Sequence, residues 1–385
     1  MSELRQEAPI YIRFDLTNEG EPLRFADPVI VLQADRLERV NQVMDDVQQY
    51  LDRGYYAAGY ISYEAAPAFD PSLTVKQGNR MPLCWFGIFE AACDEGDSSG
   101  DCPAMQGDRE VGYRVTAWQE DTSQLDYESK IGAIKDFIGA GATYQVNYTI
   151  RMHAQFEGDD YAYYLHLLER QQATYSAYLN MGKYRVLSLS PELFVRMDGN
   201  RLETRPMKGT IGRGDSAETD SRNKEALAQS QKDRAENVMI VDLLRSDLGR
   251  ISKMGSVRVD LLFAIETYNT VFQMTSTISA ETPSRLSMRE VMQAVFPCGS
   301  VTGAPKRSTM EIIEQLESSP REVYCGALGY MTPHGKGVFN VPIRTAWLDS
   351  ETGWAEFGVG GGVTWDSTSD GEYEEVQVKA KFIKK

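Results

Sequence analysis

The 385-residue chain has few histidines, no paired cysteine motif and no excess of positive charge. Its three histidines, His153, His166 and His334, lack metal-ligand spacing, and none of its five cysteines forms a Cys-x-x-Cys pair. These absences argue against a zinc site, and an odd cysteine count fits a reducing compartment better than a disulfide framework. The net charge of −16 leaves no basic surplus to displace counterions from a nucleic acid, although a few local cations still suffice to bind a small anion.

Long hydrophobic runs are also missing. No apolar stretch approaches the roughly 20 residues that a membrane-spanning helix needs, and the N-terminal segment MSELRQEAP is too polar and acidic for a secretory signal. We therefore expect a cytoplasmic protein without a membrane or nucleic-acid partner. With 42% hydrophobic and 25% charged residues the composition is that of a globular protein. Any chemistry is expected to rely on carboxylates and lysines.

Residue spacing predicts a mixed chain of helices and strands with no internal repeat and no dividing linker. The segment 91–112, rich in Asp, Gly and Ser, is predicted to be a surface loop, and residues 198–200 a turn. Strands are predicted at 9–15, 28–33, 54–63, 83–89, 144–149, 184–190, 193–197, 202–204, 337–349 and 354–365. Helices are predicted at 37–51, 127–138, 161–171 and 215–235, between a loop at 296–306 and residue 316, and from 372 onward.

One lysine lies where extended chain meets a glycine-containing bend. Lys208 stands between Pro206 and Gly209, a setting that holds backbone amides and one amine beside an adjacent cleft. Taken alone, the segment has a simpler interpretation, a solvated turn lysine.

Acidic residues near the C-terminus share one helix face. Glu372, Glu375 and Lys379 are spaced i, i+3 and i+7, and an exposed helix with an ion pair is the simpler interpretation of this pattern. Glu236, at the start of an apolar helical stretch, is likewise open to a surface interpretation. Mg²⁺, however, needs few carboxylates and often shares its ligands with an anionic substrate. Two glutamates from distant helices therefore suit a metal bound together with a carboxylate substrate.

Two glycine-containing segments suggest close approach of a ligand. Four glycines in five positions at Gly358–Gly362 weaken a strand and are typical of close contact with a ligand or another backbone. Pro305 suits the first turn of a helix whose free N–H groups are expected to meet an anion.

Taken in order, these segments resemble the chorismate-binding enzymes over residues 115–385. The matching segments are Tyr144–Asn147, Ser188–Phe194, Pro206–Thr210, Asp233–Leu243, Gly299–Lys306, Tyr324–Tyr330, Ile343–Thr345, Gly358–Gly362 and Glu372–Glu375.

Position 208 favours one branch of that family. The aminodeoxychorismate-forming enzymes resemble this chain in having lysine there, where other members usually have alanine, and Tyr60–Asp70 is similar to the same branch. Gln273 stands where many relatives, including anthranilate synthases, have histidine. An anthranilate synthase component I and a catalytically silent family member remain the alternatives.

The resemblance implies an α+β fold with two large antiparallel β-sheets packed in a sandwich and flanked by helices. It implies one domain over residues 1–385, with an N-terminal portion at 1–114 and the catalytic core motifs at 115–385. It also implies Mg²⁺-dependent amination of chorismate at C4, giving 4-amino-4-deoxychorismate for p-aminobenzoate and folate synthesis. The ammonia is expected from a separate glutamine amidotransferase subunit.

The resemblance assigns roles to individual residues. Lys208 attacks ring carbon 2 as a neutral amine, and Glu192 protonates the departing C4 hydroxyl, which requires a carboxyl with a raised pKa. Glu236, Glu375 and Glu372 are the expected Mg²⁺ ligands. The expected substrate-binding residues are Arg344, Tyr324, Lys379, Thr210, Gly358, Gly360 and Gly361.

Overall fold

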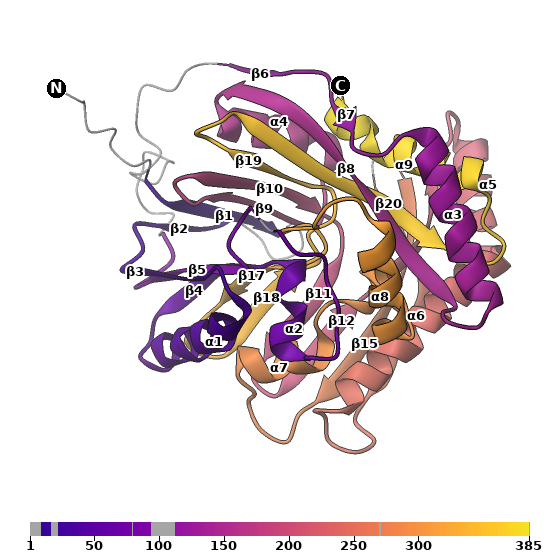
Figure 1. Cartoon of the computed structure of the whole chain (residues 1–385). Coiled ribbons are helices and arrows are strands. Elements are labelled where there is room, and N and C mark those ends of the chain that lie inside the picture. Colours follow the sequence, from indigo (N-terminus) through magenta and orange to yellow (C-terminus); the bar gives the residue numbers. More distant parts are fainter. Residues whose placement is uncertain (1–8, 17–21, 79, 94–111, 269–270, 385) are drawn as a thin grey trace.

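The computed structural model describes residues 9–16, 22–78, 80–93, 112–268 and 271–384 (Figure 1). Most of the predicted surface loop at 91–112 lies outside these residues. Within them the chain forms two large sheets, and the paired strands of both sheets are antiparallel. No described helix is both long and apolar enough to cross a bilayer.

The first sheet, sheet A, has ten strands among the described residues. Its spatial order is β16 (Gly303–Ala304), β8 (Gln145–Gly158), β20 (Trp354–Val363), β19 (Thr345–Asp349), β10 (Tyr184–Ser190), β9 (Tyr175–Asn180), β1 (Tyr11–Leu16) and β2 (Leu23–Ala26), with β6 (Tyr113–Val115) and β7 (Gln119–Glu120) paired to β8.

The second sheet, sheet B, also has ten strands in the described part of the chain. Its order is β13 (Met207–Gly212), β15 (Val271–Glu281), β12 (Arg201–Arg205), β11 (Leu193–Asp198), β18 (Lys336–Asn340), β17 (Ala327–Met331), β4 (Tyr56–Ile61), β5 (Cys84–Phe89) and β3 (Ile30–Ala34), with β14 (Arg258–Thr267) paired to β15. Strands from the first 114 residues therefore lie in both sheets.

Helices cover the outer faces of the sheets (Figure 1). Their bounds are α1 (Leu37–Asp52), α2 (Ala66–Phe69), α3 (Gln124–Gly139), α4 (Asp160–Gln171), α5 (Ala217–Gln229), α6 (Gln231–Gly249), α7 (Met288–Val295), α8 (Lys306–Leu316) and α9 (Ser369–Lys384), and short 3₁₀ turns lie at η1 (Tyr63–Ala65) and η3 (Gly299–Val301).

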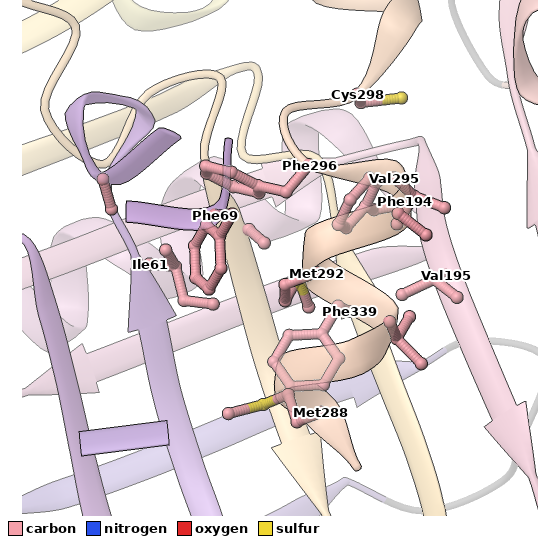
Figure 2. Close-up of a cluster of buried hydrophobic side chains, with 14 of the residues drawn as sticks. Ile61, Phe69, Phe194, Val195, Met288, Met292, Val295, Phe296, Cys298 and Phe339 are labelled. Carbon is pink, nitrogen blue, oxygen red and sulfur yellow. The ribbon is translucent and has the colours of Figure 1, made fainter. Parts of the chain in front are cut away.

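Three apolar layers hold the elements together. Phe14 and Trp347 of sheet A meet Trp85 and Tyr330 of sheet B in the sandwich interior. On the outer face of sheet B, the apolar side of α7 packs against β11 and β18, as Figure 2 shows. A third cluster joins α3, α4 and α9 to sheet A. The predicted α+β class, with two antiparallel sheets in a sandwich flanked by helices, is confirmed.

Two of the short connections between the sheets are neighbours. The chain leaves β10 of sheet A and enters β11 of sheet B through Pro191 and Glu192, and it returns from β18 to β19 through 341–344. The Val341 amide donates to the Glu192 carbonyl at 3.1 Å, so the two crossings run side by side. These crossings bring residues about 150 positions apart to one place.

The predicted strand at 337–349 is wrong. It is two strands, β18 and β19, in different sheets, because Pro342 and the positive φ of Arg344 (50°) interrupt the extended chain. The apolar pattern continues across this break, so the spacing alone does not reveal it.

The predicted single helix at 215–235 is also wrong. Ser230 has extended dihedral angles, ends α5 and caps α6 by accepting from the Asp233 amide at 3.3 Å. The new helix starts there and carries Glu236 in its second turn.

Candidate active site

A cavity of about 800 Å³ opens where the two crossings, β13, β20, α6 and α9 meet. Most of the predicted site residues line it, although Glu192 and Lys379 are 187 positions apart in the sequence. The lining includes Glu192, Lys208, Thr210, Glu236, Tyr324, Arg344, Gly358, Gly360, Glu375 and Lys379. Gly361 and Glu372 are not among the lining residues and lie just behind them.

Lys208 projects from a β-bulge. Met207 pairs with Thr275 and Thr210 pairs with Gln273, so two residues of β13 stand opposite one residue of β15. The second of the two, Gly209, has φ of +85°, and a side chain there would meet Asp233 of α6 at 2.8 Å. The glycine bend expected from the sequence is this bulge within a strand, and it directs Lys208 toward the cavity.

Glu192 lies on the first crossing and is almost completely buried, at 2% exposure. Burial raises the pKa of its carboxyl to about 7, although the Ser300 hydroxyl, the nearby Lys208 amine and the Met207 amide lower it. Its Oε1 has no hydrogen-bond partner. A buried carboxyl that is partly protonated at neutral pH has the property required of a general acid.

Arg344 lies on the second crossing, beside Glu192. Its Nη1 donates to Gln171 Oε1 at 3.1 Å, and no carboxylate of the described residues pairs with it. Tyr324 lines the same wall, and its ring packs against Gly358, where an added Cβ would come within 2.3 Å of the ring. A guanidinium held at a cavity wall without an acidic partner is suited to bind an anionic ligand.

The acidic residues of α9 converge over β20. A Cβ at Gly361 would lie 3.1 Å from Glu372 Oε2 and 3.5 Å from Glu375 Oε1, so glycine leaves space for both carboxylates. Glu375 Oε1 is 2.6 Å from Lys379 Nζ, which also donates to the Gly360 carbonyl at 2.9 Å. Lys379 therefore holds an acid and the strand together.

The electrostatics of these acids differ. Burial and the nearby Glu375 carboxylate raise the pKa of Glu372, although Ser367 donates to it at 2.6 Å. Burial also raises the pKa of Glu236. Burial acts in the same direction on Glu375, but Lys379 outweighs it and leaves the pKa of Glu375 lowered.

The carboxylates of Glu372 and Glu375 suit a hard cation, although they are too few to hold a metal by themselves. The described residues contain no group of three His, Cys, Asp or Glu side chains arranged to hold a metal by themselves. Glu372 Oε2 is nevertheless buried without a hydrogen-bond partner, and Glu375 lies beside it. Carboxylate oxygens with an open coordination sphere fit Mg²⁺, which commonly retains waters and takes ligands from its substrate.

The N-terminus of α8 is not where an anion would enter. Pro305 precedes that helix, but neither it nor Lys306 lines the cavity. Lys306 Nζ instead donates to Asp247 Oδ2 at 2.8 Å. The expected anion contact at this helix is therefore not supported by the geometry.

Two residues at or next to the cavity, Gln145 and Lys232, were not predicted as site residues. Gln145 is 1% exposed, and neither side-chain polar atom has a hydrogen-bond partner. An added Cβ at Gly362 would lie 2.0 Å from Gln145 Nε2 and 3.0 Å from Lys208 Nζ, so the amide and the amine share one place. Gln145 belongs to Tyr144–Asn147, one of the segments that carry the family resemblance, so the sequence could have indicated it as a site residue. Lys232, 3.9 Å from Glu236, lies in a polar stretch that offered no such indication.

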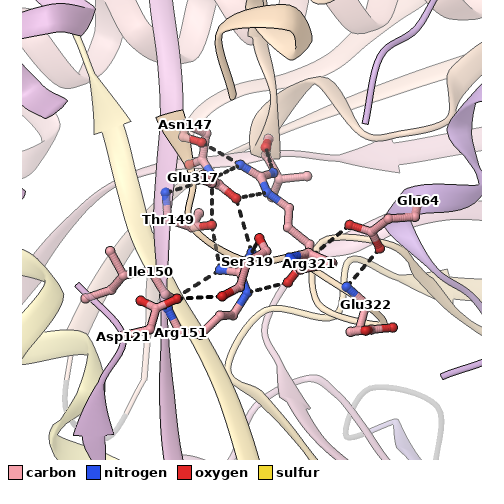
Figure 3. Close-up of polar contacts among 12 residues, drawn as sticks. Glu64, Asp121, Asn147, Thr149, Ile150, Arg151, Glu317, Ser319, Arg321 and Glu322 are labelled. Atoms are coloured by element: carbon pink, nitrogen blue, oxygen red, sulfur yellow. Dashed lines mark hydrogen bonds and ion pairs between the residues drawn. The ribbon is translucent and has the colours of Figure 1, made fainter. Parts of the chain in front are cut away.

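A buried ion cluster lies behind the cavity wall (Figure 3). Glu317 pairs with Arg151 at 3.1 Å and with Arg321 at 2.6 Å. Arg321 also donates to the carbonyls of Val301 and Asn147, at 2.7 and 2.8 Å, and both residues line the cavity. We call Arg151, Glu317 and Arg321 the Glu317 cluster; it fixes segments that form the cavity wall.

Comparison with known proteins identifies the family of this chain. The family model for chorismate binding enzymes matches residues 11–385, and the chain belongs to this family. Over 268 residues it is 40% identical to aminodeoxychorismate synthase component 1 of Escherichia coli (strain K12), covering 70% of this chain and 59% of that protein. It is 36% identical over 268 residues to anthranilate synthase component 1 of Aquifex aeolicus (strain VF5), covering 70% and 54%.

A solved structure supports the fold alone. Anthranilate synthase component I from Streptococcus pneumoniae TIGR4 superimposes with a TM-score of 0.79 at 21% identity, covering 100% of this chain and 94% of that one. The sequence matches span only about three fifths of the length of the E. coli relative.

Proposed function

We propose that this protein is an aminodeoxychorismate synthase component I. It aminates chorismate at C4, with Mg²⁺ as cofactor and Lys208 as a transient covalent nucleophile, to give 4-amino-4-deoxychorismate. The ammonia comes from a separate glutamine amidotransferase subunit. The relatives bearing this name support the proposal, as does the resemblance of Pro206–Thr210 to the same branch.

One observation carries the proposal: Lys208 and the buried acid Glu192 line the same cavity. Amination by way of a lysine adduct needs a nucleophile and a proton donor for the departing hydroxyl. A carboxyl with a pKa of about 7 supplies that proton near neutral pH. The lysine amine adds to ring carbon 2 as the C4 hydroxyl leaves as water. Ammonia then adds at C4 and expels the lysine, so the overall reaction exchanges hydroxyl for amine.

The remaining residues bind and orient the substrate. Arg344, with Tyr324 beside it, receives the enolpyruvyl carboxylate, because its guanidinium has donors to spare. Thr210 Oγ1 donates to Gln273 Oε1 at 2.7 Å and borders the cavity near Lys208. Gly358 and Gly360 line the cavity, and their missing side chains leave room for the Tyr324 ring and for Thr149 of β8.

Glu236, Glu372 and Glu375 would hold Mg²⁺ at the ring-carboxylate end of the cavity. The ion, when bound, neutralises that carboxylate and withdraws electron density from the ring. Lys379 keeps Glu375 ionised and in place, since its Nζ contacts both that carboxylate and the Gly360 carbonyl. The buried Glu372 oxygen without a partner supports this assignment.

The decisive experiment incubates the purified protein with chorismate, MgCl₂ and ammonium chloride at pH 8 and separates the products by chromatography. We expect 4-amino-4-deoxychorismate, and none when EDTA replaces the metal salt. Anthranilate as the product would instead identify an anthranilate synthase component I, a reading that Lys208 and Gln273 disfavour. Unchanged chorismate in all reactions would identify a catalytically silent family member.

A further inference from the structure

The bulge that carries Lys208 is held by one side chain from the neighbouring strand. Gln273 of β15 is 4% exposed, and its Nε2 donates to the Gly209 carbonyl at 2.7 Å. Its Oε1 accepts from Thr210 Oγ1, also at 2.7 Å. Both polar atoms of this carboxamide are thus bonded to the two residues that directly follow Lys208.

A bulge removes regular backbone pairing, so the direction of its residues depends on other contacts. Here Met207↔Thr275 and Thr210↔Gln273 are the last regular pairs on either side, and Lys208 lies between them. The carboxamide spans this gap with one donor and one acceptor. Its own strand is anchored on the other side of the sheet by Phe272 and Met274, which are buried against Leu227 of α5.

We propose that Gln273 is a positioning residue for Lys208. It acts through the backbone of Gly209 and the side chain of Thr210, holding the bulge so that the amine faces the cavity at the distance its reaction requires. A nucleophile displaced by about 1 Å can lose roughly 100-fold in rate. A glutamine suits this task because a carboxamide offers a donor and an acceptor on one flat group, and it has no charge to compete with the nearby glutamates.

Gln273 also lines the cavity, so its part must be separated from direct substrate binding. A residue that positions Lys208 affects the rate of adduct formation and leaves the carboxylate contacts at Arg344 and Tyr324 intact. Its loss therefore lowers kcat and leaves KM nearly unchanged. A residue that binds chorismate in the ground state raises KM instead.

The inference rests on the proposed function for its kinetic part alone, and a second measurement is independent of chorismate. Gln273→Met keeps the length and removes both hydrogen bonds. Gln273→Glu keeps the acceptor for Thr210 and places a carboxylate oxygen against the Gly209 carbonyl. Gln273→His restores a ring N–H donor. The control is Ser279→Ala, a buried polar residue on the same strand that pairs with Glu203 and Arg258 away from the cavity.

Hydrogen–deuterium exchange of the peptide covering residues 205–214 is measured on each free protein. We expect exchange at least about 5-fold faster in the Met and Glu variants, and close to the wild-type rate in the His and Ser279→Ala variants. Steady-state kinetics with chorismate and ammonium should show kcat lowered roughly 10- to 100-fold in the Met and Glu variants, with KM within about 3-fold of wild type.

The outcomes separate the two ideas. If the wild-type protein does not aminate chorismate, the proposed function fails, and the exchange data alone decide the role of Gln273. Exchange in the Met and Glu variants equal to that of Ser279→Ala overturns the positioning role. A raised KM with unchanged kcat also overturns it, because Gln273 then binds substrate directly. If Gln273→Met does not fold, the nearly isosteric Gln273→Glu carries the test.

Discussion

The cavity and the Glu317 cluster both contain buried ionisable side chains. Both carboxylate oxygens of Glu317 have hydrogen-bond partners, whereas two carboxylate oxygens at the cavity have none. In the cluster both oxygens of Glu317 accept hydrogen bonds from guanidinium groups, and Thr149 adds two more at 2.9 and 2.7 Å (Figure 3). Glu192 Oε1 in the cavity and Glu372 Oε2 just behind its lining have no hydrogen-bond partner. Burial acts on the pKa of both kinds of acid, yet Arg321 and Arg151 reverse its effect and lower the pKa of Glu317, whereas the pKa of Glu192 rises to about 7.

This difference separates a structural role from a chemical one. Buried polar groups in folded proteins are nearly always hydrogen-bonded, so two unpartnered carboxylate oxygens at one cavity are notable. The carboxylate of Glu317 forms its hydrogen bonds with groups of the protein itself. The cavity has a buried acid with an unpartnered oxygen, Glu192, and a guanidinium without an acidic partner among the described residues, Arg344.

The largest contrast is expected from removing Lys208. Lys208→Ala should lower turnover of chorismate by more than about 10³-fold, because the proposed covalent step uses the amine at this position. Its thermal midpoint should stay close to that of wild type, since Lys208 is only half-buried. Lys232→Ala, at the cavity rim, is the matched control and should lose less than about 10-fold. Retention of more than a tenth of the activity in Lys208→Ala would remove Lys208 from the mechanism.

In the Glu317 cluster we expect a substitution to lower the stability of the fold. Arg321→Met leaves the Glu317 carboxylate buried with one guanidinium instead of two, and we expect a loss of about 3–5 kcal/mol in the free energy of unfolding. Urea denaturation measures this loss. Arg307→Met, at an exposed i,i+4 pair with Glu311, should leave the midpoint unchanged. Equal midpoints for the two variants would show that the cluster adds nothing to stability.

A smaller effect with an informative pH dependence is expected for Glu192→Gln. Because the folded pKa of Glu192, about 7, lies above its ordinary value of 4.5, the wild-type fold loses stability as pH rises from 4.5 through 7. The glutamine variant should therefore be more stable than wild type by up to about 3 kcal/mol at pH 8 and nearly equal to it at pH 4.5.

The same variant should lose activity, because the C4 hydroxyl then leaves without a proton donor. We expect a loss of about 10²- to 10⁴-fold. Urea denaturation and initial rates at both pH values test the pair of effects. A variant less stable than wild type at pH 8 would mean that the carboxylate is well solvated in the fold.

The smallest effect is expected at the proposed metal site. In Gly361→Ala the new methyl group lies about 3.1 Å from Glu372 Oε2, which is tighter than ordinary contact. The carboxylate must move, and the Mg²⁺ concentration for half-maximal activity should rise about 3- to 10-fold. Gly132→Ala on α3, where the methyl group meets nothing within 4 Å, is the control. An unchanged Mg²⁺ requirement would place the metal away from Glu372.

The sequence predicted the cavity better than the cluster. Lys208, Glu192 and Glu375 lie in family segments of recognisable order, so their meeting at one cavity could be expected. Arg151 and Glu317 are 166 positions apart and belong to no short motif, and their pairing depends on how β8 packs against the segment after α8. Long-range pairs of this kind are set by tertiary packing, which residue spacing does not record.

Helices and strands were likewise predicted where residue spacing records them and missed where it does not. The helix predicted at 37–51 is α1, because Val40, Met44, Val47 and Leu51 repeat at helical spacing and are all buried. The break at Ser230 was missed although a serine followed three residues later by Asp233 is a helix-start signal. The division of 337–349 between two sheets was missed because both strands are buried and apolar.

The two neighbouring connections between the sheets link the packing of the sandwich to the geometry of the proposed site. Glu192 and Arg344 lie on two of the connections that join sheet A to sheet B, so the offset between the sheets sets the distance from the proposed proton donor to the proposed carboxylate-binding guanidinium. The side chains packed between sheet A and sheet B, among them Trp347 and Tyr330, set the distance between the two sheets. We therefore expect a change in the volume of these interior side chains to shift one sheet against the other and to alter the rate of the proposed reaction, even when every cavity residue is unchanged.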